Sequence, residues 1–372
     1  MRPVAVSTPG KLILMGEHAV VYGRPALVAA IDLRLTARLV PSGAGVHLDL
    51  PGLAHQESLS WDALRAYARA ARERWEGYAV HPGAAGFRAV RGEDPAHVVK
   101  TALGEAASWL DASSSLSSLQ SLPSLASLSG LHLRIDSELP IGSGFGSSAA
   151  TATAVIAGCL LAHGREADPA TIERLVLETE RRQHGLPSGV DGATVLYGGV
   201  LWARKLPAGG LERERIDAGS SLLGGLRVYD TGTPAEPTGA VVAAVRERRE
   251  RDPAAVERLL DRMEDTTRAF RAELARPAAD PDRTLHLIRD HEACLEDLGV
   301  VPEAVRAAVR SIESAGGAAK ISGAGSLRGP GAGSLLVYHP EPERIAGWSF
   351  LAPFRFYPVH LGAPGFREED PE

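Results

Sequence analysis

The chain has 372 residues, 44% of them hydrophobic, so it can bury one large core or two ordinary ones and is not a disordered tail. Its 40 basic and 46 acidic residues leave a net charge of -6, which gives no basic face for nucleic acid and no basic cluster for anionic lipid. The two cysteines form no Cys-x-x-Cys pair, which argues against a disulfide framework or a zinc site. We expect a cytoplasmic protein that acts on a small molecule, because the sequence has neither a signal-peptide core nor an apolar run of membrane-spanning length.

The first part of the chain is predicted to mix strands with helices. Hydrophobic alternation predicts strands over residues 4–7, 11–15 and 26–40, the first two separated by a bend at Pro9-Gly10. Helical spacing predicts helices over residues 61–77 and 94–110. A Ser-Leu stretch over residues 113–129 is interpreted as a surface excursion, and a catalytic lid is the alternative interpretation.

A glycine turn between a strand and a helix is the most informative local pattern. The strand is predicted over residues 131–137 and the helix over residues 149–161, with Gly142, Gly144 and Gly146 between them. These glycines allow positive φ and close approach of the backbone, and the helix N-terminus directs N–H groups toward an anion. The pattern favours a phosphate site, although a plain turn before a buried helix is the alternative.

The rest of the chain alternates helical blocks with further turns. A helix is predicted over residues 168–183, with Asp168 as its N-cap, and helix-rich blocks over residues 239–271 and 282–315. We place a domain boundary near Gly224-Gly225, where an apolar strand follows. A second glycine run, residues 320–334, leads into a strand over residues 335–338. It is interpreted as a loop that faces the same ligand as the first, with a hairpin as the alternative.

Charged side chains near apolar segments are the candidates for chemistry. Lys11, Glu17 and His18 lie beside predicted strands and tight turns, where charges need partners. Glu180 lies near the end of a predicted helix, and Asp191 is predicted on the turn-rich loop 184–192. A carboxylate held on such a loop is a candidate catalytic group.

Four segments together resemble the motifs of the GHMP kinases, and within that superfamily they are most similar to the mevalonate kinases. They are residues 6–23 (VSTPGKLILMGEHAVVYG), 138–150 (ELPIGSGFGSSAA), 184–191 (HGLPSGVD) and 320–325 (KISGAG). The resemblance implies an α+β fold with two domains. A domain of the ribosomal S5 domain 2 type would cover residues 1–224, and a ferredoxin-like domain would cover residues 225–372. It also implies transfer of the ATP γ-phosphoryl group to the 5-hydroxyl of mevalonate.

The resemblance also implies roles for single residues. Asp191 would be the catalytic aspartate and Lys11 the lysine that pairs with it, and Ser148 and Glu180 would be the Mg²⁺ ligands. Ser148 as a helix N-cap and Glu180 as a solvated charge are the structural alternatives. The implied ATP-binding residues are Pro140, Gly142, Ser143, Gly144, Gly146, Ser147, Ser148, Gly323, Ala324 and Gly325.

Glu17, His18 and Thr238 would contact mevalonate. Thr233 competes with Thr238 for its role, and His18 could instead be a structural histidine. We call the glycine run 320–334 the third glycine loop, because it contains the third glycine motif of the family. The sequence departs from the family pattern at residues 326–331, which lengthen this loop and bring in Arg328 as an extra phosphate contact.

Three other functions are left open at this point: a phosphomevalonate kinase, a mevalonate 3-kinase, and a nucleotide-binding regulator without turnover. A homodimer is left open as well.

Overall fold

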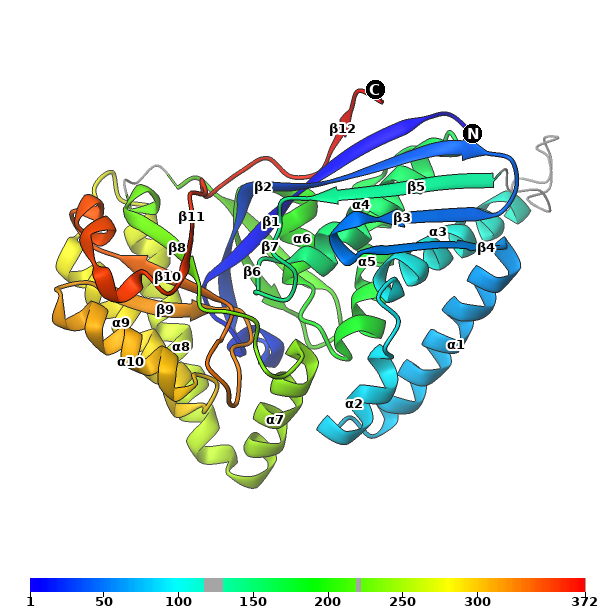
Figure 1. Cartoon of the computed structure of the whole chain (residues 1–372). Coiled ribbons are helices and arrows are strands. Elements are labelled where there is room, and N and C mark those ends of the chain that lie inside the picture. The colour runs from blue at the N-terminus through cyan, green and yellow to red at the C-terminus, as the bar shows by residue number, and fades with distance from the viewer. Residues whose placement is uncertain (117–129, 219–221, 372) are drawn as a thin grey trace.

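Two sheets and the helices packed on them make up the described part of the chain (Figure 1). The computed structural model describes residues 1–116, 130–218 and 222–371. In Figure 1 the larger sheet lies above a layer of helices that includes α4 and α5, and the smaller sheet lies among α8, α9 and α10.

The larger sheet has the strand order β12-β1-β2-β5-β3-β4, with β6 and β7 as a ribbon attached to β2. Only the β3–β5 pair is parallel among the described strands of this sheet. Its strands are β1 (Val4–Met15), β2 (Pro25–Ser42), β3 (Val46–Leu50), β4 (His55–Leu59), β5 (Gly130–Ser137), β6 (Val200–Lys205), β7 (Leu211–Ile216) and β12 (Arg367–Glu369).

The smaller sheet is antiparallel, in the order β11-β8-β10-β9. Its strands are β8 (Leu226–Asp230), β9 (Ala318–Ser322), β10 (Ser334–Tyr338) and β11 (Arg355–Tyr357). The helices are α1 (Trp61–Val80), α2 (Ala84–Arg91), α3 (His97–Leu116), α4 (Ser147–Ala162), α5 (Pro169–His184), α6 (Val190–Tyr197), α7 (Thr238–Arg251), α8 (Pro253–Leu274), α9 (Pro281–Asp297) and α10 (Glu303–Ser314).

Helix α4 is the central helix of the larger unit, because it packs on β1 and β2 and also against α3, α5 and α6. Its small side chains allow this close packing, and its residues are mostly buried. At Gly158 the helix comes so close to the sheet that a Cβ would lie 2.4 Å from Leu39 Cδ1 and 3.3 Å from Val6 Cγ2. The helix that follows the first glycine loop is therefore fixed rigidly on the sheet.

Two local predictions are confirmed and one is corrected. Asp168 accepts hydrogen bonds from Ala170 N and Thr171 N and so caps α5. Cys159 and Cys294 are free and buried. The two strands expected over residues 4–15 are in fact one strand, β1, because the bend at Pro9-Gly10 is only a register shift in its pairing with β2.

Other predictions are only partly covered by the structure. Residues 113–116 of the Ser-Leu stretch continue α3, and residues 117–129 lie outside the described residues. The boundary at 224/225 stays a prediction: the smaller sheet follows it, whereas β12 returns to pair with β1. Among the described residues, no helix has the length and apolar character needed to cross a membrane.

The packing of α4 predicts opposite effects of the same substitution at two helical glycines. Gly158→Ala should lower the free energy of unfolding by about 1–3 kcal/mol, because the new methyl group enters a filled space. Gly77→Ala, at an exposed position of helix α1 where a Cβ meets nothing within 4 Å, should raise it by about 0.5–1 kcal/mol. Urea unfolding measures both, and equal effects would contradict the close approach of α4 to the sheet.

Candidate active site

An ion pair between β1 and α6 lies at the centre of the candidate site. Lys11 Nζ is 3.1 Å from Asp191 Oδ2. The lysine side chain is 4% exposed and the aspartate side chain 31%, so the carboxylate can be reached by a ligand while the ammonium is enclosed. Asp191 was predicted on a loop, which is wrong: it lies in the first turn of α6, whose N-cap residue is Gly189 with φ 89°. Its position is thus set by a helix rather than by a flexible turn.

The first glycine loop makes room for Lys11. The loop connects β5 to α4, and Gly142, Gly144 and Gly146 all have positive φ. A Cβ on Gly146 would lie 2.7 Å from Lys11 Cγ, and the Lys11 N–H donates to Phe145 O at 2.9 Å. The loop and the lysine therefore hold each other in place.

Ser148 and Glu180 lie together, as the Mg²⁺ hypothesis requires. The Ser148 hydroxyl donates to Glu180 Oε1 at 2.9 Å and lies 2.9 Å from His184 Nε2. Ser148 is the second residue of α4, whereas the N-cap position is Gly146, so the N-cap alternative for Ser148 is wrong. Glu180 is 3% exposed, so the solvated-charge alternative is wrong as well.

Burial determines the protonation of both titratable partners of Ser148. Burial and the nearby charge of Asp191 raise the pKa of Glu180 to about 8. Burial lowers the pKa of His184 to about 4, so its imidazole is neutral near pH 7. A half-buried hydroxyl and a buried carboxyl lie side by side here, and burial disfavours the ionised form of the carboxyl. Two such oxygen donors suit a hard divalent cation.

The two glycine loops are in direct contact. Ser334 N donates to Ser143 O at 2.9 Å from one loop to the other, and within the glycine run 320–334 Ser334 Oγ donates to Ser322 O at 2.9 Å. A Cβ on Gly144 would lie 2.8 Å from Ser322 O, and one on Gly333 would lie 2.9 Å from Ser143 O. Side chains at either glycine would thus push the loops apart. Of the remaining predicted ATP-binding residues, Pro140, Gly323, Ala324 and Gly325 lie on these loops, and Ser147 is the first residue of α4.

The predicted acceptor-site residues differ in burial: His18 is buried, whereas Thr238 is exposed. His18 is buried, has φ 56°, and its Nε2 lies 2.9 Å from Ala324 O. Thr238 is exposed as the first residue of α7, and the competing Thr233 lies beside the first glycine loop, since a Cβ on Gly142 would be 3.4 Å from Thr233 Cγ2. The choice between the two threonines stays a prediction.

Glu17 is completely buried and both of its carboxylate oxygens have protein partners. Oε1 is hydrogen-bonded to the Lys320 ammonium, and Oε2 lies 3.1 Å from His291 Nε2. Burial opposes its ionisation, yet Lys320 and His291 together hold the pKa of Glu17 below its usual value. Its role as a substrate contact stays a prediction.

Arg328, the expected extra phosphate contact, pairs with a carboxylate. Its Nε donates to Glu236 Oε1 at 2.8 Å, and its side chain is 79% exposed. Glu236 also accepts from the Ser326 hydroxyl at 2.7 Å, so it ties down the start of the lengthened loop. The phosphate role of Arg328 stays a prediction.

The sequence interpretation missed three residues of this region as candidates. His184 follows Glu180 by four residues on α5, a spacing that places both on one helix face and could have indicated it. Lys320 lies in the apolar strand β9, where a charge requires a partner. His291 lies on α9 and gave no local signal.

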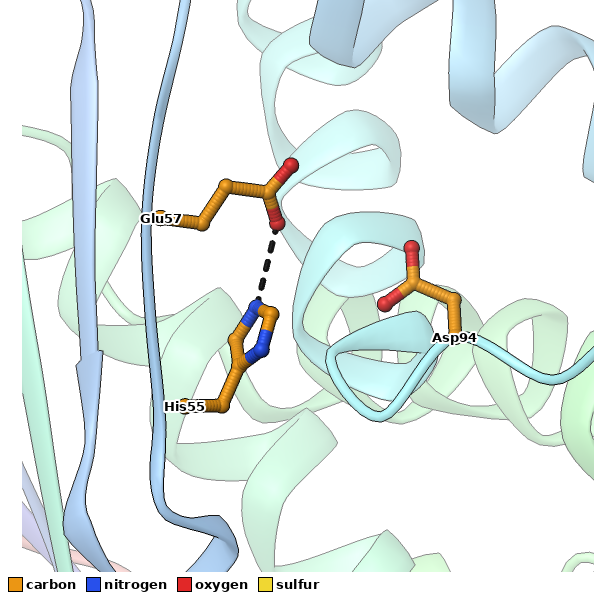
Figure 2. Close-up of side chains that lie close together, drawn as sticks. All are labelled: His55, Glu57 and Asp94. Atoms are coloured by element: carbon orange, nitrogen blue, oxygen red, sulfur yellow. Dashed lines mark hydrogen bonds and ion pairs between the residues drawn. The ribbon is translucent and has the colours of Figure 1, made fainter.

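A further group with metal-ligand chemistry consists of His55, Glu57 and Asp94 (Figure 2). Their ligand atoms lie within 4.8 Å of one another. Lys100 Nζ, however, is 2.6 Å from Glu57 Oε2 and 2.7 Å from Asp94 Oδ2. The protein's own ammonium supplies the cation that these carboxylates need, so the group ties β4 to α3.

Comparisons with known proteins agree with this geometry. The family model "GHMP kinases N terminal domain" matches residues 112–199. The mevalonate kinase of Bos taurus is 31% identical over 375 residues, which cover 92% of this chain and 87% of the bovine one. The chain belongs to the mevalonate kinase family of the GHMP kinases.

Other mevalonate kinases are similar to this chain as well. The mevalonate kinase of Methanothermobacter thermautotrophicus is 28% identical over 90% of both chains. The solved mevalonate kinase of Methanococcus jannaschii superposes with a TM-score of 0.70 at 19% identity, over 96% of this chain and 98% of that one. The predicted α+β GHMP kinase fold is confirmed.

The close approach of Gly146 to Lys11 predicts a loss of function that ordinary backbone strain would not cause. Gly146→Ala adds a methyl group against the lysine side chain, so the Lys11–Asp191 pair must open and kinase activity should fall about 10-fold or more. Gly164→Ala is the matched control at the other end of α4, with φ 70° and no neighbour within 4 Å. Both should lose about 1 kcal/mol of stability from strain, and equal activities would contradict this role of Gly146.

Glu292 predicts a pH dependence of stability. Its carboxyl accepts from Ile321 N at 3.0 Å, and burial raises its pKa to about 8. The unfolded chain therefore releases this proton near pH 4.5 while the folded chain keeps it, so the contribution of Glu292 to stability falls as pH rises from about 4.5 to 8. Glu292→Gln removes this dependence, so denaturant unfolding should find the variant more stable relative to wild type at pH 8 than at pH 5. A pH-independent difference would contradict the raised pKa.

Proposed function

We propose that the chain transfers the γ-phosphoryl group of ATP to the 5-hydroxyl of mevalonate and releases ADP and 5-phosphomevalonate. The observation that carries this proposal is the Lys11–Asp191 pair, 3.1 Å apart, next to the phosphate-type loop and to Glu180. The family membership of the chain supports the choice of acceptor. We also propose that the protein acts in the cytoplasm and that its chain divides into two domains near residue 224.

Asp191 orients the 5-hydroxyl of mevalonate and accepts its proton as the oxygen bonds to phosphorus and the bond to the ADP oxygen breaks. Lys11 holds the aspartate in place and, being enclosed, stabilises negative charge on the transferring group. A loose, metaphosphate-like transition state needs little prior deprotonation of the nucleophile, so positioning and charge stabilisation dominate.

ATP lies along the two glycine loops, where Pro140, Ser143, Gly144 and Gly146 bring the backbone close to the phosphates. Ser147 and Ser148 begin α4, whose N-terminus favours an anion. Gly323, Ala324 and Gly325 supply the opposite side, since the third glycine loop contacts the first. Mevalonate binds next to this ATP site and contacts His18 and Thr238.

Mg²⁺ fits the donors at the start of α4. Ser148 and Glu180 would hold it through a hydroxyl and a carboxylate oxygen, the donors that Mg²⁺ prefers. When bound, the ion neutralises phosphate charge during transfer. Binding would also compensate the buried negative charge of Glu180, so the carboxylate can ionise near pH 7.

The acceptor that is used and the position of the phosphate in the product distinguish the proposed reaction from the three alternative functions. Purified protein with Mg-ATP and mevalonate should release ADP, and phosphomevalonate or galactose should not replace mevalonate. In the ³¹P spectrum of the product, a phosphate on the primary C5 couples to two protons, whereas one on the tertiary C3 couples to none. ADP release with phosphomevalonate alone would indicate a phosphomevalonate kinase, an uncoupled product signal a 3-kinase, and nucleotide binding without turnover a regulator.

The proposed role of Asp191 predicts the effect of an isosteric change. Asp191→Asn keeps the shape but removes the proton acceptor, so kcat should fall roughly 10²-fold or more. Asp168→Asn is the matched control, because asparagine also caps a helix and Asp168 caps α5. Turnover measured by coupled ADP release compares them, and near-wild-type kcat in Asp191→Asn would remove Asp191 from the mechanism.

A further inference from the structure

A buried polar network connects the turn after β1 to the smaller sheet. We call Glu17, Lys320, His291 and Thr266 the Glu17 network. Glu17 contacts Lys320 through Oε1 and lies 3.1 Å from His291 Nε2 through Oε2, and His291 Nδ1 lies 2.8 Å from Thr266 Oγ1. All four residues are at most 4% exposed. The network joins residues that are up to 303 positions apart in the sequence.

The network contacts the two segments to which the proposed function assigns the substrates: the turn after β1 and the third glycine loop. Lys320 precedes the third glycine loop on β9, and its Nζ also donates to Ile321 O at 2.7 Å and to Ile13 O at 3.4 Å. Ile13 N in turn donates to Ser322 Oγ at 2.8 Å. His18, next to Glu17, meets Ala324 O of the same loop at 2.9 Å. The turn after β1 and the nucleotide loop are thus held together by several polar contacts.

The Glu17 carboxylate is enclosed by these partners. Because the carboxylate is completely buried, a substrate hydroxyl could reach it only by displacing Lys320 or His291. Displacing Lys320 would leave a buried ammonium unpaired. Its neighbour His18 lies on the same turn and contacts the loop backbone directly. Glu17 is therefore suited to fix His18 in place rather than to contact the substrate.

We propose that Glu17, Lys320 and His291 are positioning residues that set the place of His18 relative to the third glycine loop. Through them, the geometry of the acceptor pocket and that of the nucleotide site depend on each other. This inference rests on the proposed function, because it assigns His18 to the acceptor side and residues 323–325 to the nucleotide side. It removes Glu17 from the direct contacts of mevalonate.

The test compares Glu17→Gln, Lys320→Met and the double variant. Each single change disturbs both segments, so kcat/KM for mevalonate and for ATP should both fall, by about 10- to 100-fold. The double variant should be no worse than the poorer single one, because both changes break one contact. It also removes both buried charges, so its Tm should exceed that of Lys320→Met and provide a folded protein for kinetics.

Lys100→Met is the matched control, since it removes another nearly buried ammonium, which is paired with Glu57 and Asp94. It should lower Tm and leave both KM values unchanged. The proposal is overturned if Lys320→Met likewise changes only Tm. It is also overturned if Glu17→Gln raises the KM for mevalonate alone and the effect of Lys320→Met multiplies with it, because Glu17 would then contact the substrate independently.

A binding measurement separates this inference from the proposed function. Wild-type protein without mevalonate-dependent ADP release would reject the function. The Kd of a non-hydrolysable ATP analogue with Mg²⁺, measured by calorimetry, would still test the network. We expect about a 10-fold or larger increase in Kd in Lys320→Met and no change in Lys100→Met. An unchanged Kd in Lys320→Met overturns the inference whether or not mevalonate is the acceptor.

Discussion

A charge buried in a strand must find a partner, and this requirement organises the molecule around β1. Lys11 lies in a strand whose residues are all buried, so its ammonium needs a carboxylate nearby. Asp191 on α6 supplies it at 3.1 Å, and the absence of a Cβ on Gly146 gives the lysine stem its path. The strand, the first glycine loop and α6 must therefore keep one relative position.

A second enclosed charge, Glu17, lies in the turn that follows the same strand. Glu17 is paired with Lys320 and His291, which come from the smaller sheet and from α9. One strand thus meets α6 through its lysine and the smaller sheet through the turn that follows it. The proposed phosphoryl transfer occurs between these two fixed points, where both glycine loops are already in contact.

Local patterns in the sequence predicted the helices, the glycine loop before α4 and the cap at Asp168, because each depends on neighbouring residues. The motifs indicated the family and, through the resemblance, the pairing of Lys11 with Asp191. The sequence could not indicate that Asp191 begins a helix, since small residues such as Ser188 and Gly189 are typical both of turns and of helix starts. Nor could it bring His291 to Glu17, because that contact spans 274 positions and depends on how the two sheets pack.

The central claim is that the Lys11–Asp191 pair lies where phosphoryl transfer occurs. A crystal structure with Mg²⁺, a non-hydrolysable ATP analogue and mevalonate tests it most directly. We predict the mevalonate 5-hydroxyl within hydrogen-bond distance of Asp191, the terminal phosphate beside Lys11, and Glu17 still bonded to Lys320. A 5-hydroxyl directed away from Asp191, or a nucleotide bound away from the two glycine loops, would contradict it.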